Sequence, residues 1–357
     1  MSNSFSNTLI AWYAEHGRAL PWRGTRDPYL IWVSEVILQQ TRIGQGREYY
    51  ERFCRDYPDV RALAQASEQQ VLKSWEGLGY YSRARNMCAA ARQIVDEHGG
   101  VFPSTYEGLR ALKGVGPYTA AAIASFAYRL PHPVIDGNVY RFVARHFGIA
   151  TPVATAAAQK EFGRLLGRLI DRQRPDLFNQ AIMDFGSTYC QPARHDCANC
   201  IFHDTCVARK QGNVDLLPVR AARATTRHRY FHYVCLHWLE GGREMTLVHR
   251  RDGNDIWKGL YEFPLLETAQ PLSPEALRRR ARKYAHELAG RQPREVRVGQ
   301  PVLHQLTHQT LHATFVEAYF DGAARLSGGK EMAVACDELA AMPFPRLIAR
   351  YLSLRAM

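Results

Sequence analysis

Hydrophobic residues recur with the period of an α-helix through much of residues 1–210. The stretch 29–41, YLIWVSEVILQQT, follows Asp27 and Pro28, an N-cap residue and a proline suited to the first turn of a helix. The run YTAAAIASFAY, residues 118–128, is nearly all apolar, which predicts a helix buried on every side. Strand-like alternation is scarce here, so we expect a mostly helical first domain.

Two capping boxes predict further helix starts. Ser67 with Gln70 precedes the helical pattern VLKSWEGL, and Ser104 with Glu107 precedes GLRAL. In such a box the serine hydroxyl and the side chain three residues later satisfy backbone N–H groups of the first turn. We therefore expect helices to begin just after Ser67 and just after Ser104.

The pattern changes after residue 210. Residues 211–227 carry proline and several arginines and read as a linker. Strand-like segments follow: YFHYVCLHWLE, a turn at Gly241 and Gly242, EMTLVHRR and LHATFVEAYF. A basic helical stretch, PEALRRRARKYAHEL, begins after Ser273. Residues 228–357 therefore predict a second domain of the α+β class.

Composition and charge narrow the class of protein. A chain of 357 residues is too long for one ordinary core, and 46% hydrophobic residues exclude a disordered chain. The net charge of +12 and the pI near 9.4 favour a polyanionic partner such as nucleic acid. The N-terminus lacks a secretory signal and no apolar run could span a bilayer. We expect a cytoplasmic monomer that does not associate with membranes.

Four cysteines lie within one short segment at the spacing C-x6-C-x2-C-x5-C: Cys190, Cys197, Cys200 and Cys206. Disulfides across such short loops would be strained. Structural zinc with four cysteines usually uses two tight pairs, and only one tight pair exists here. The spacing favours a [4Fe–4S] cluster, with zinc and four unrelated buried thiols as the alternatives. The other four cysteines are scattered singly, as in a reducing compartment.

A second motif is the sequence LKGVGPYTA. Gly114, Val115 and Gly116 stand between a short predicted helix and a longer one. Glycines at this point allow a tight turn and let backbone N–H groups approach a phosphate. This pattern is typical of a helix-hairpin-helix, which holds DNA by its backbone without reading the base sequence.

Downstream of the hairpin lies VIDGNVYRFVAR. Asp136 precedes Gly137 and Asn138, where it can cap the following helix, and capping alone is one interpretation of it. The order of hairpin, aspartate-bearing loop and four cysteines resembles the helix-hairpin-helix DNA glycosylase superfamily, in the branch with an iron–sulfur cluster.

Within that branch the chain resembles the adenine DNA glycosylase (MutY) family over almost its whole length. The matching motifs are LPWRGTRDPYLIWVSEVILQQTRI from Leu20, GLGYYSRARN from Gly77, the hairpin, IDGNV, the cysteines, and IWKGLYEFP from Ile256. The resemblance implies a mostly α helix-hairpin-helix catalytic domain with a [4Fe–4S] cluster at 190–206, followed by an α+β Nudix-like domain.

The resemblance also implies an activity: hydrolysis of the N-glycosidic bond of adenine mispaired with 8-oxoguanine or guanine in double-stranded DNA, after base flipping. Glu35 matches the general acid that protonates adenine, and Asp136 matches the anion that stabilises the oxocarbenium sugar. Tyr118 and Asn138 match supporting hydrogen-bond partners. Without the family, Glu35 would read as a solvated glutamate; with it, we expect a partly dry pocket that raises its pKa.

Further positions carry roles by the same resemblance. Residues that enclose or contact adenine are matched by Arg18, Trp22, Arg23 and Gln180, although Trp22 could equally be a core aromatic. Residues that wedge into the duplex and support the orphaned base are matched by Gln40, Thr41, Leu78 and Tyr80.

One absence bears on mechanism. Bifunctional relatives carry a lysine after the hairpin glycines, and here that position is Tyr118. Water should then complete the reaction and leave an abasic site. Two alternatives remain: an endonuclease III-like glycosylase and lyase, and a DNA-binding protein that keeps the cluster without catalysis.

The second domain departs from its relatives in two places. The glutamates that bind metal in Nudix hydrolases are missing, with only Glu267 and Glu275 present, so we interpret it as a recognition module. In the family, a Phe-Ser-His loop checks for the oxidised guanine; here Leu306, Thr307 and His308 stand in its place. The threonine keeps a hydroxyl, whereas leucine lacks the aromatic face, so discrimination between 8-oxoguanine and guanine is the property at issue.

Overall fold

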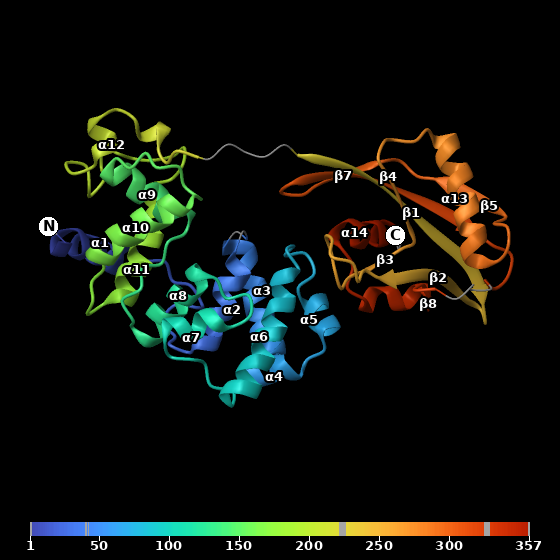
Figure 1. Cartoon of the computed structure of the whole chain (residues 1–357), viewed down its shortest axis with the longest axis horizontal. Helices are drawn as coiled ribbons and strands as arrows, with labels where there is room; N and C mark the ends of the chain where they lie inside the picture. Colours follow the sequence, from blue (N-terminus) through green and yellow to red (C-terminus); the bar gives the residue numbers. More distant parts are fainter. Residues whose placement is uncertain (1, 40, 42, 221–225, 325–328, 356–357) are drawn as a thin grey trace. The chain divides into compact units, whose positions relative to one another are not determined.

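The structure is a computed structural model that describes residues 2–39, 41, 43–220, 226–324 and 329–355 (Figure 1). The chain divides into two compact units. Residues 1–65 and 86–222 form the first, and residues 66–85 and 223–357 form the second. The sequence-based boundaries 1–210, 211–227 and 228–357 stay predictions.

Helices make up the first unit. They are α1 (Ser2–His16), α2 (Pro28–Leu38), α3 (Ile43–Asp56), α4 (Val60–Gln65), most of α6 (Ser82–His98), α7 (Tyr106–Ala111), α8 (Pro117–Tyr128), α9 (Gly137–Phe147), α10 (Ala156–Leu169), α11 (Pro175–Asp184), the π-helix η1 (Phe185–Tyr189), α12 (Val207–Lys210) and the 3-10 helix η2 (Val214–Leu216). The expectation of a mostly helical first domain is confirmed.

The second unit combines α5 (Glu68–Ser74) with a sheet and two further helices. Its strands are β1 (Arg227–Glu240), β2 (Arg243–Arg250), β3 (Tyr261–Glu262), β4 (Leu265–Thr268), β5 (Glu295–Val298), β6 (Val302–Gln305), β7 (Gln309–Tyr319) and β8 (Met332–Ala335). Its later helices are α13 (Pro274–Ala289), the 3-10 helix η3 (Cys336–Ala341) and α14 (Arg346–Arg355). The α+β class of the second domain is confirmed.

Helix α8 forms the centre of one half of the first unit. It contacts α2, α7 and α11, and its residues from Thr119 to Ser125 are all buried. A helix that is apolar on every side must be covered on every side, as the sequence predicted. A second core, built around Phe142, Phe178 and Phe185, joins α1, α9, α10 and α11.

Local capping follows the sequence closely at two of three predicted helix starts. Asp27 accepts a hydrogen bond from the Tyr29 amide at 2.8 Å, and Ser67 with Gln70 forms a complete capping box. The box predicted at Ser104 is wrong by one residue, because Thr105 is the N-cap of α7 and accepts from the Gly108 amide.

In the sheet, β1 is the central strand. It pairs in parallel with β7 from Arg227–Gln309 to His237–Tyr319, and the strand order is β3-β2-β1-β7-β5. Alternate residues of β1 enter two cores: one contains α13, and the other contains α14. Because helices cover both faces, β1 is a nearly continuous buried run rather than an alternating one.

The predicted linker begins inside the first unit. Arg145 Nε donates to the carbonyls of Val214 and Leu217, and the Val153 amide donates to the carbonyl of Val219 at 2.9 Å. Residues 214–219 are therefore attached to helix α9 and its neighbours. Among the described residues, none of the helices combines the length and the apolar composition that a bilayer crossing requires.

Candidate active site

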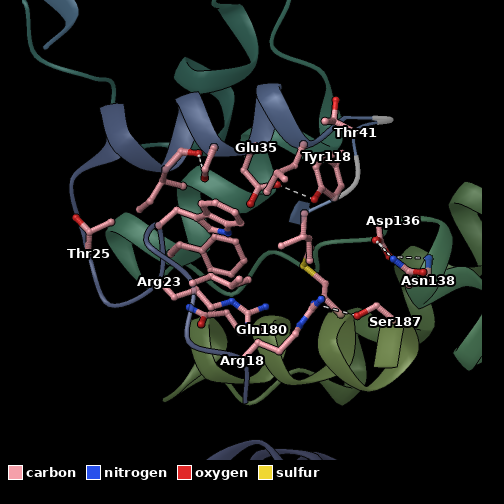
Figure 2. A pocket seen from close by; sticks show the side chains of 18 residues that line it. Arg18, Arg23, Thr25, Glu35, Thr41, Tyr118, Asp136, Asn138, Gln180 and Ser187 are labelled. Atoms are coloured by element: carbon pink, nitrogen blue, oxygen red, sulfur yellow. Dashed lines mark hydrogen bonds between the residues drawn. The ribbon is translucent and has the colours of Figure 1, made fainter. Parts of the chain in front are cut away.

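A cavity of about 190 Å³ opens among α2, α8, α11 and the N-terminus of α9 (Figure 2). Residues expected from sequence to form a catalytic or adenine-binding site all line it: Arg18, Trp22, Arg23, Glu35, Tyr118, Asp136, Asn138 and Gln180. Thr41, expected to contact DNA, also lines it, whereas Gln40 lies outside the described residues. Segments more than a hundred residues apart in the chain thus meet at one cavity.

Glu35 projects from the buried helix α2 and is only 6% exposed. The Tyr118 hydroxyl donates a hydrogen bond to its Oε2 at 2.6 Å. Burial raises the pKa of Glu35 to about 7, and the nearby charge of Asp136 adds to the rise, while the Tyr118 hydrogen bond and Arg23 oppose it. Glu35 can therefore hold a proton near neutral pH, and it is not the solvated glutamate of the alternative interpretation.

Asp136 is the N-cap of α9 and also faces the cavity. Its Oδ1 accepts from the amides of Asn138 and Val139 at 2.8 and 2.7 Å, and its Oδ2 accepts from Asn138 Nδ2 at 2.7 Å. Burial raises the pKa of Asp136, and these donors together with Arg141 limit the rise because they favour the charged form. Capping and exposure to the cavity are thus compatible at one side chain.

Asp184 is a site residue that the sequence analysis missed. It is fully buried and binds both arginines of the cavity: Arg18 through its amide and its guanidinium, and Arg23 through both terminal nitrogens. The arginines hold the pKa of Asp184 below its usual range, although burial by itself raises it. Asp184 follows Gln180 by one helical turn on α11, so helical spacing could have placed it on the same face.

Gln180 and Trp22 are held by their neighbours. The Tyr13 hydroxyl donates to Gln180 Oε1 at 2.7 Å and itself accepts from Arg23 at 3.1 Å, so Arg23 and Gln180 are linked through Tyr13. Trp22 lines the cavity, is 7% exposed and meets Tyr50 edge to face. Both interpretations of Trp22, cavity wall and core aromatic, apply.

Helix α11 runs directly into the π-helical turn η1, which lies against the start of α9. A Cβ added at Gly186 would stand 2.6 Å from the Asn138 carbonyl oxygen, so only glycine permits this approach. Arg141 joins the two segments, donating to Asn138 Oδ1 at 2.9 Å and to the carbonyls of Gly186 and Cys190. A π-helical turn at a functional site is a recurrent feature of proteins.

All four clustered cysteines line a second, smaller cavity next to Arg145 and Arg209. Each is a free thiol, and Arg145 Nη1 lies 3.5 Å from Cys190 Sγ. The four cysteines thus share one small cavity, where they could hold a metal ion or a cluster.

The helix-hairpin-helix turn joins α7 to α8. Gly114 has a φ of 73°, in the left-handed region, and an added Cβ would meet the Asn86 side chain at 2.5 Å. Gly116 is the N-cap of α8 without a side-chain hydrogen bond, and an added Cβ there would meet nothing within 4 Å. Val115 is buried and its amide is bonded to Leu112, so an approaching phosphate would meet the glycines first.

Comparison with known proteins shows to which family this chain belongs. Residues 33–167 match the family described as HhH-GPD superfamily base excision DNA repair protein, and residues 233–354 match the NUDIX domain. The adenine DNA glycosylase of Buchnera aphidicola subsp. Schizaphis graminum (strain Sg) is 30% identical over 265 residues, which cover 74% of this chain and 75% of that protein. The chain belongs to the adenine DNA glycosylase family.

Other members and a solved structure agree. The adenine DNA glycosylase of Mus musculus is 40% identical over 229 residues, 61% of this chain, and the chain spans 44% of that relative's length. A solved structure of a thermostable thymine-DNA glycosylase superposes with a TM-score of 0.54 at 26% identity, covering 59% of this chain and 97% of that one.

In this family member the second unit brings other predicted residues together. A cavity of about 460 Å³ is lined by Leu78, Tyr80, Leu306, Thr307 and His308, and the Tyr80 and Thr307 hydroxyls are hydrogen-bonded. Tyr80 is 44% exposed and has a φ of 47°, a backbone conformation that costs energy for a bulky residue. These residues come from two distant parts of the chain, and the sequence predicted that they contact the base opposite adenine. In the structure they line one cavity.

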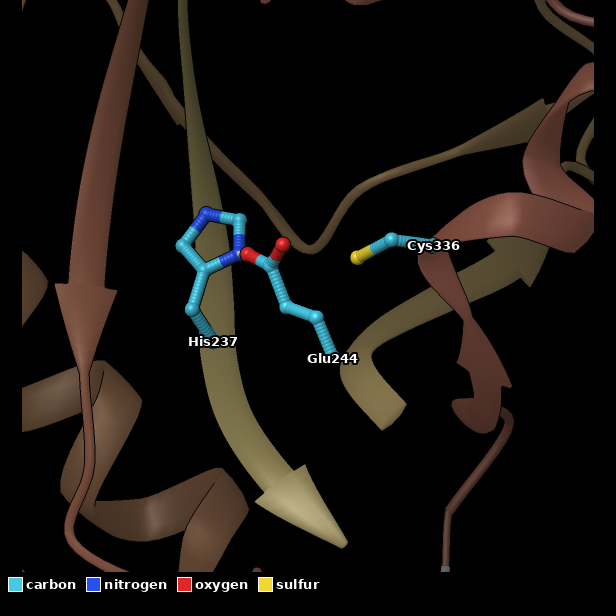
Figure 3. A group of neighbouring side chains, drawn as sticks. All are labelled: His237, Glu244 and Cys336. Atoms are coloured by element: carbon cyan, nitrogen blue, oxygen red, sulfur yellow. Dashed lines mark ion pairs between the residues drawn. The ribbon is translucent and has the colours of Figure 1, made fainter. Parts of the chain in front are cut away.

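Glu267 and Glu275 were the only candidates for the metal-binding glutamates of a Nudix hydrolase. In the described part of this adenine DNA glycosylase family member, neither belongs to a group that could hold a metal ion. Glu267 pairs with Arg229 at 2.7 Å, and Glu275 is exposed in the first turn of α13. A different group, His237, Glu244 and Cys336, has possible ligand atoms within 4.8 Å of one another (Figure 3). The Arg355 guanidinium donates a hydrogen bond to Glu244 at 2.7 Å, so the positive charge of Arg355 already balances this carboxylate.

Proposed function

We propose that this chain is a DNA glycosylase that removes adenine from double-stranded DNA, where adenine is mispaired with 8-oxoguanine or guanine. The observation that carries the proposal is the cavity in which buried Glu35, bonded to Tyr118, faces Asp136. Two carboxyl groups in unlike environments suit cleavage of a glycosidic bond, because one can give a proton while the other stays charged.

The chemistry divides between the two acids. Glu35, with a pKa of about 7, protonates the purine so that it leaves as a neutral base. Asp136, held as an anion by the donors of the α9 N-terminus, stabilises the positive charge that develops on the sugar. Arg18, Arg23 and Gln180 enclose the flipped base, since they form the opposite wall of the cavity.

Water completes the reaction in this proposal. Among the described residues that line the cavity there is no lysine, and Tyr118 is committed to Glu35. An amine nucleophile for a Schiff base is therefore missing from the lining, which supports a monofunctional enzyme that leaves an abasic site.

Recognition of the opposite base falls to the second unit. Tyr80, in its strained conformation, and Thr307 present two hydroxyls beside Leu78 and His308. We assign these residues to the orphaned 8-oxoguanine. The threonine hydroxyl takes the part of the family's serine, whereas Leu306 lacks the aromatic face of the family's phenylalanine, so the preference for 8-oxoguanine over guanine is the property that the two adenine duplexes of the assay below compare.

We assign a [4Fe–4S] cluster to Cys190, Cys197, Cys200 and Cys206. Their spacing in the sequence, with only one tight pair, and their shared cavity support the assignment. When bound, the cluster supplies four iron–thiolate bonds that tie the loop 190–206 to one point. Arg145 compensates the thiolate charge, since its guanidinium contacts Cys190 Sγ and the carbonyls of Gln191 and Pro192.

One assay tests the activity. The full chain is incubated with duplexes that carry adenine opposite 8-oxoguanine, adenine opposite guanine, thymine opposite guanine, or thymine glycol, and half of each sample is then treated with alkali. We expect strand breaks only in the two duplexes that carry a mispaired adenine, and only in the samples treated with alkali. Glu35→Gln should abolish them while binding persists. Breaks at thymine glycol without alkali would instead establish the lyase alternative. Release of thymine from the duplex with thymine opposite guanine would show that the enzyme removes thymine rather than adenine.

A further inference from the structure

A cavity in the Nudix-like domain is unconnected with the residues discussed so far. It measures about 310 Å³, within the range of roughly 300–1,000 Å³ typical of ligand pockets. It lies between the first turns of α13, the strands β1 and β7, and the connection from β5 to β6. Figure 1 shows α13 beside β5 at this edge of the sheet.

The wall of this cavity is part apolar and part polar. Its polar part comes from Tyr230, His232, Arg278, Gln300, His312 and Thr314. Leu272, Pro274 and Leu277 form one side, and Val298 and Pro301 form another. The two residues that follow Pro301 in the edge strand β6, Val302 and Leu303, are 37% and 68% exposed. The apolar part of the cavity wall, together with these exposed apolar residues, forms a surface that gains free energy when a partner covers it.

The rim carries unbalanced positive charge. Arg278 lines the cavity, and Arg279 and Arg280 continue along the exposed side of α13. None of these three arginines makes an ion pair in the described part of the chain, although α13 carries Glu275 and Glu287. None of the described residues that line the cavity is acidic. Hydrogen bonds to Glu275 lower its pKa most, and the nearby Arg278 and Arg279 lower it further, so this one carboxylate is outnumbered by the three guanidinium groups. Guanidinium groups in excess are suited to further carboxylates, which they bind through two hydrogen bonds.

We propose that α13 and this cavity form a docking surface for an acidic segment of a partner protein, with one large apolar side chain inserted into the cavity. Charge complementarity selects the acidic flanks, and the apolar wall selects the anchor. A DNA duplex fits less well, because its bases are stacked and its phosphates would leave the exposed Val302 and Leu303 uncovered. The surface is additional to the glycosylase site and does not depend on it.

The proposal is tested by selecting binders from a displayed library of 12-residue peptides on the full chain. We expect enrichment of acidic peptides with a single large aromatic or aliphatic residue. Synthetic copies should bind at least tenfold more weakly when that residue is replaced by alanine. They should also bind at least tenfold more weakly to the triple variant Arg278→Glu, Arg279→Glu, Arg280→Glu.

Two further variants separate docking from general charge. Arg164→Glu, Arg168→Glu and Arg172→Glu change the same charge at exposed arginines elsewhere and should leave peptide affinity within twofold. Val298→Trp fills the cavity and should weaken binding without altering the charge. All variants should keep adenine release from a short duplex, which reports on folding as well.

Peptides without a shared anchor, or equal loss with both triple variants, would overturn the proposal. So would a duplex that displaces the peptide and loses affinity with the same α13 variants, because the surface would then be a nucleic-acid contact.

Discussion

Single residues in this protein take their chemistry from what surrounds them. Glu35 and Asp184 are both buried carboxyl groups of the first unit, yet their pKa values are shifted in opposite directions. Glu35 meets a hydroxyl and a second carboxyl, whereas Asp184 meets two guanidinium groups. Burial raises the pKa of a carboxyl, and close positive charge lowers it, so the neighbours decide which acid can give a proton.

The raised pKa of Glu35 predicts how activity depends on pH. The protonated acid is the active form, so adenine release under single-turnover conditions should fall above about pH 7, approaching tenfold per pH unit. The measurement is the single-turnover rate from pH 5.5 to 9 on a duplex with adenine opposite 8-oxoguanine. A rate that stays constant to pH 9 would contradict the assignment of Glu35 as the acid.

The same pKa predicts a stability effect. A carboxyl whose pKa is raised in the folded state stabilises the fold at low pH, and this contribution is lost as pH rises from about 4.5 to about 7. Glu35→Gln should therefore be more stable than the parent at pH 8, by up to about 3 kcal/mol, and similar at pH 4.5. Urea unfolding at the two pH values checks this, and an equal difference at both would show that burial of charge is not the cause.

Asp184 predicts a loss of stability. Replacing it by asparagine leaves Arg18 and Arg23 without their counter-charge, and removing one partner of a buried ion pair costs about 3–5 kcal/mol. Glu51→Gln, which breaks an exposed pair with Arg47, should cost at most about 1 kcal/mol. Thermal unfolding of both variants supplies the comparison, and similar melting temperatures would contradict the role given to Asp184.

At the scale of elements, helix ends position most of the site. The N-terminus of α9 presents Asp136, the N-terminus of α8 follows the hairpin, and the turn η1 closes on α9 where Gly186 permits contact. Helix termini carry unpaired N–H groups and a partial positive charge, so they are suited to a carboxylate and to a phosphate. The hairpin and the Asp136 motif therefore lie at helix N-termini, whereas Glu35 and Gln180 project from within α2 and α11.

The two hairpin glycines predict different outcomes. Gly114→Ala forces a left-handed backbone on alanine and a collision with Asn86, so it should lower the melting temperature. Gly116→Ala meets open space and should leave the melting temperature unchanged, yet weaken DNA binding, because its Cβ stands where a phosphate would approach. Calorimetry and fluorescence anisotropy with a duplex test both. Unchanged DNA affinity for Gly116→Ala would exclude the hairpin from the DNA contact.

At the scale of the whole molecule, the proposed catalytic site and the proposed recognition site for the opposite base lie in different units. The first holds the cavity and the four clustered cysteines, and the second holds the Tyr80 and Thr307 hydroxyls. Residues 66–85 belong to the second unit although they precede much of the first in the chain. The net charge of +12 gives the chain a field that attracts a polyanion regardless of its base sequence.

The cluster assignment predicts metal content. The full chain, purified without oxygen, should be brown and carry about four iron atoms. Cys200→Ala should lower the iron content, the melting temperature and DNA affinity together, because the loop 190–206 loses its common attachment. Cys336→Ala, at a cysteine outside that loop, should retain the iron. A colourless preparation with one zinc per chain would overturn the assignment.

What the sequence determined by itself is local. Helical periods, the caps at Asp27 and Ser67, the strands after residue 228 and the cysteine spacing each depend on residues close together in the chain, so they could be read in order. The cap of α7 was misplaced by one residue, since serine and threonine are both good N-cap residues and the adjacent Thr105, rather than Ser104, accepts the Gly108 amide.

What the tertiary structure decided depends on contacts between distant residues. Glu35 is ordinary in the sequence and becomes an acid near neutral pH because the fold buries it, and the charge of Asp136, 101 residues later, adds to the rise in its pKa. Helical spacing from Gln180 could have placed Asp184 on the right face, but its pairing with Arg18 and Arg23, more than 160 residues earlier, was visible only in the structure. Burial and charge act through space, and a linear pattern does not state which side chains will share a dry cavity.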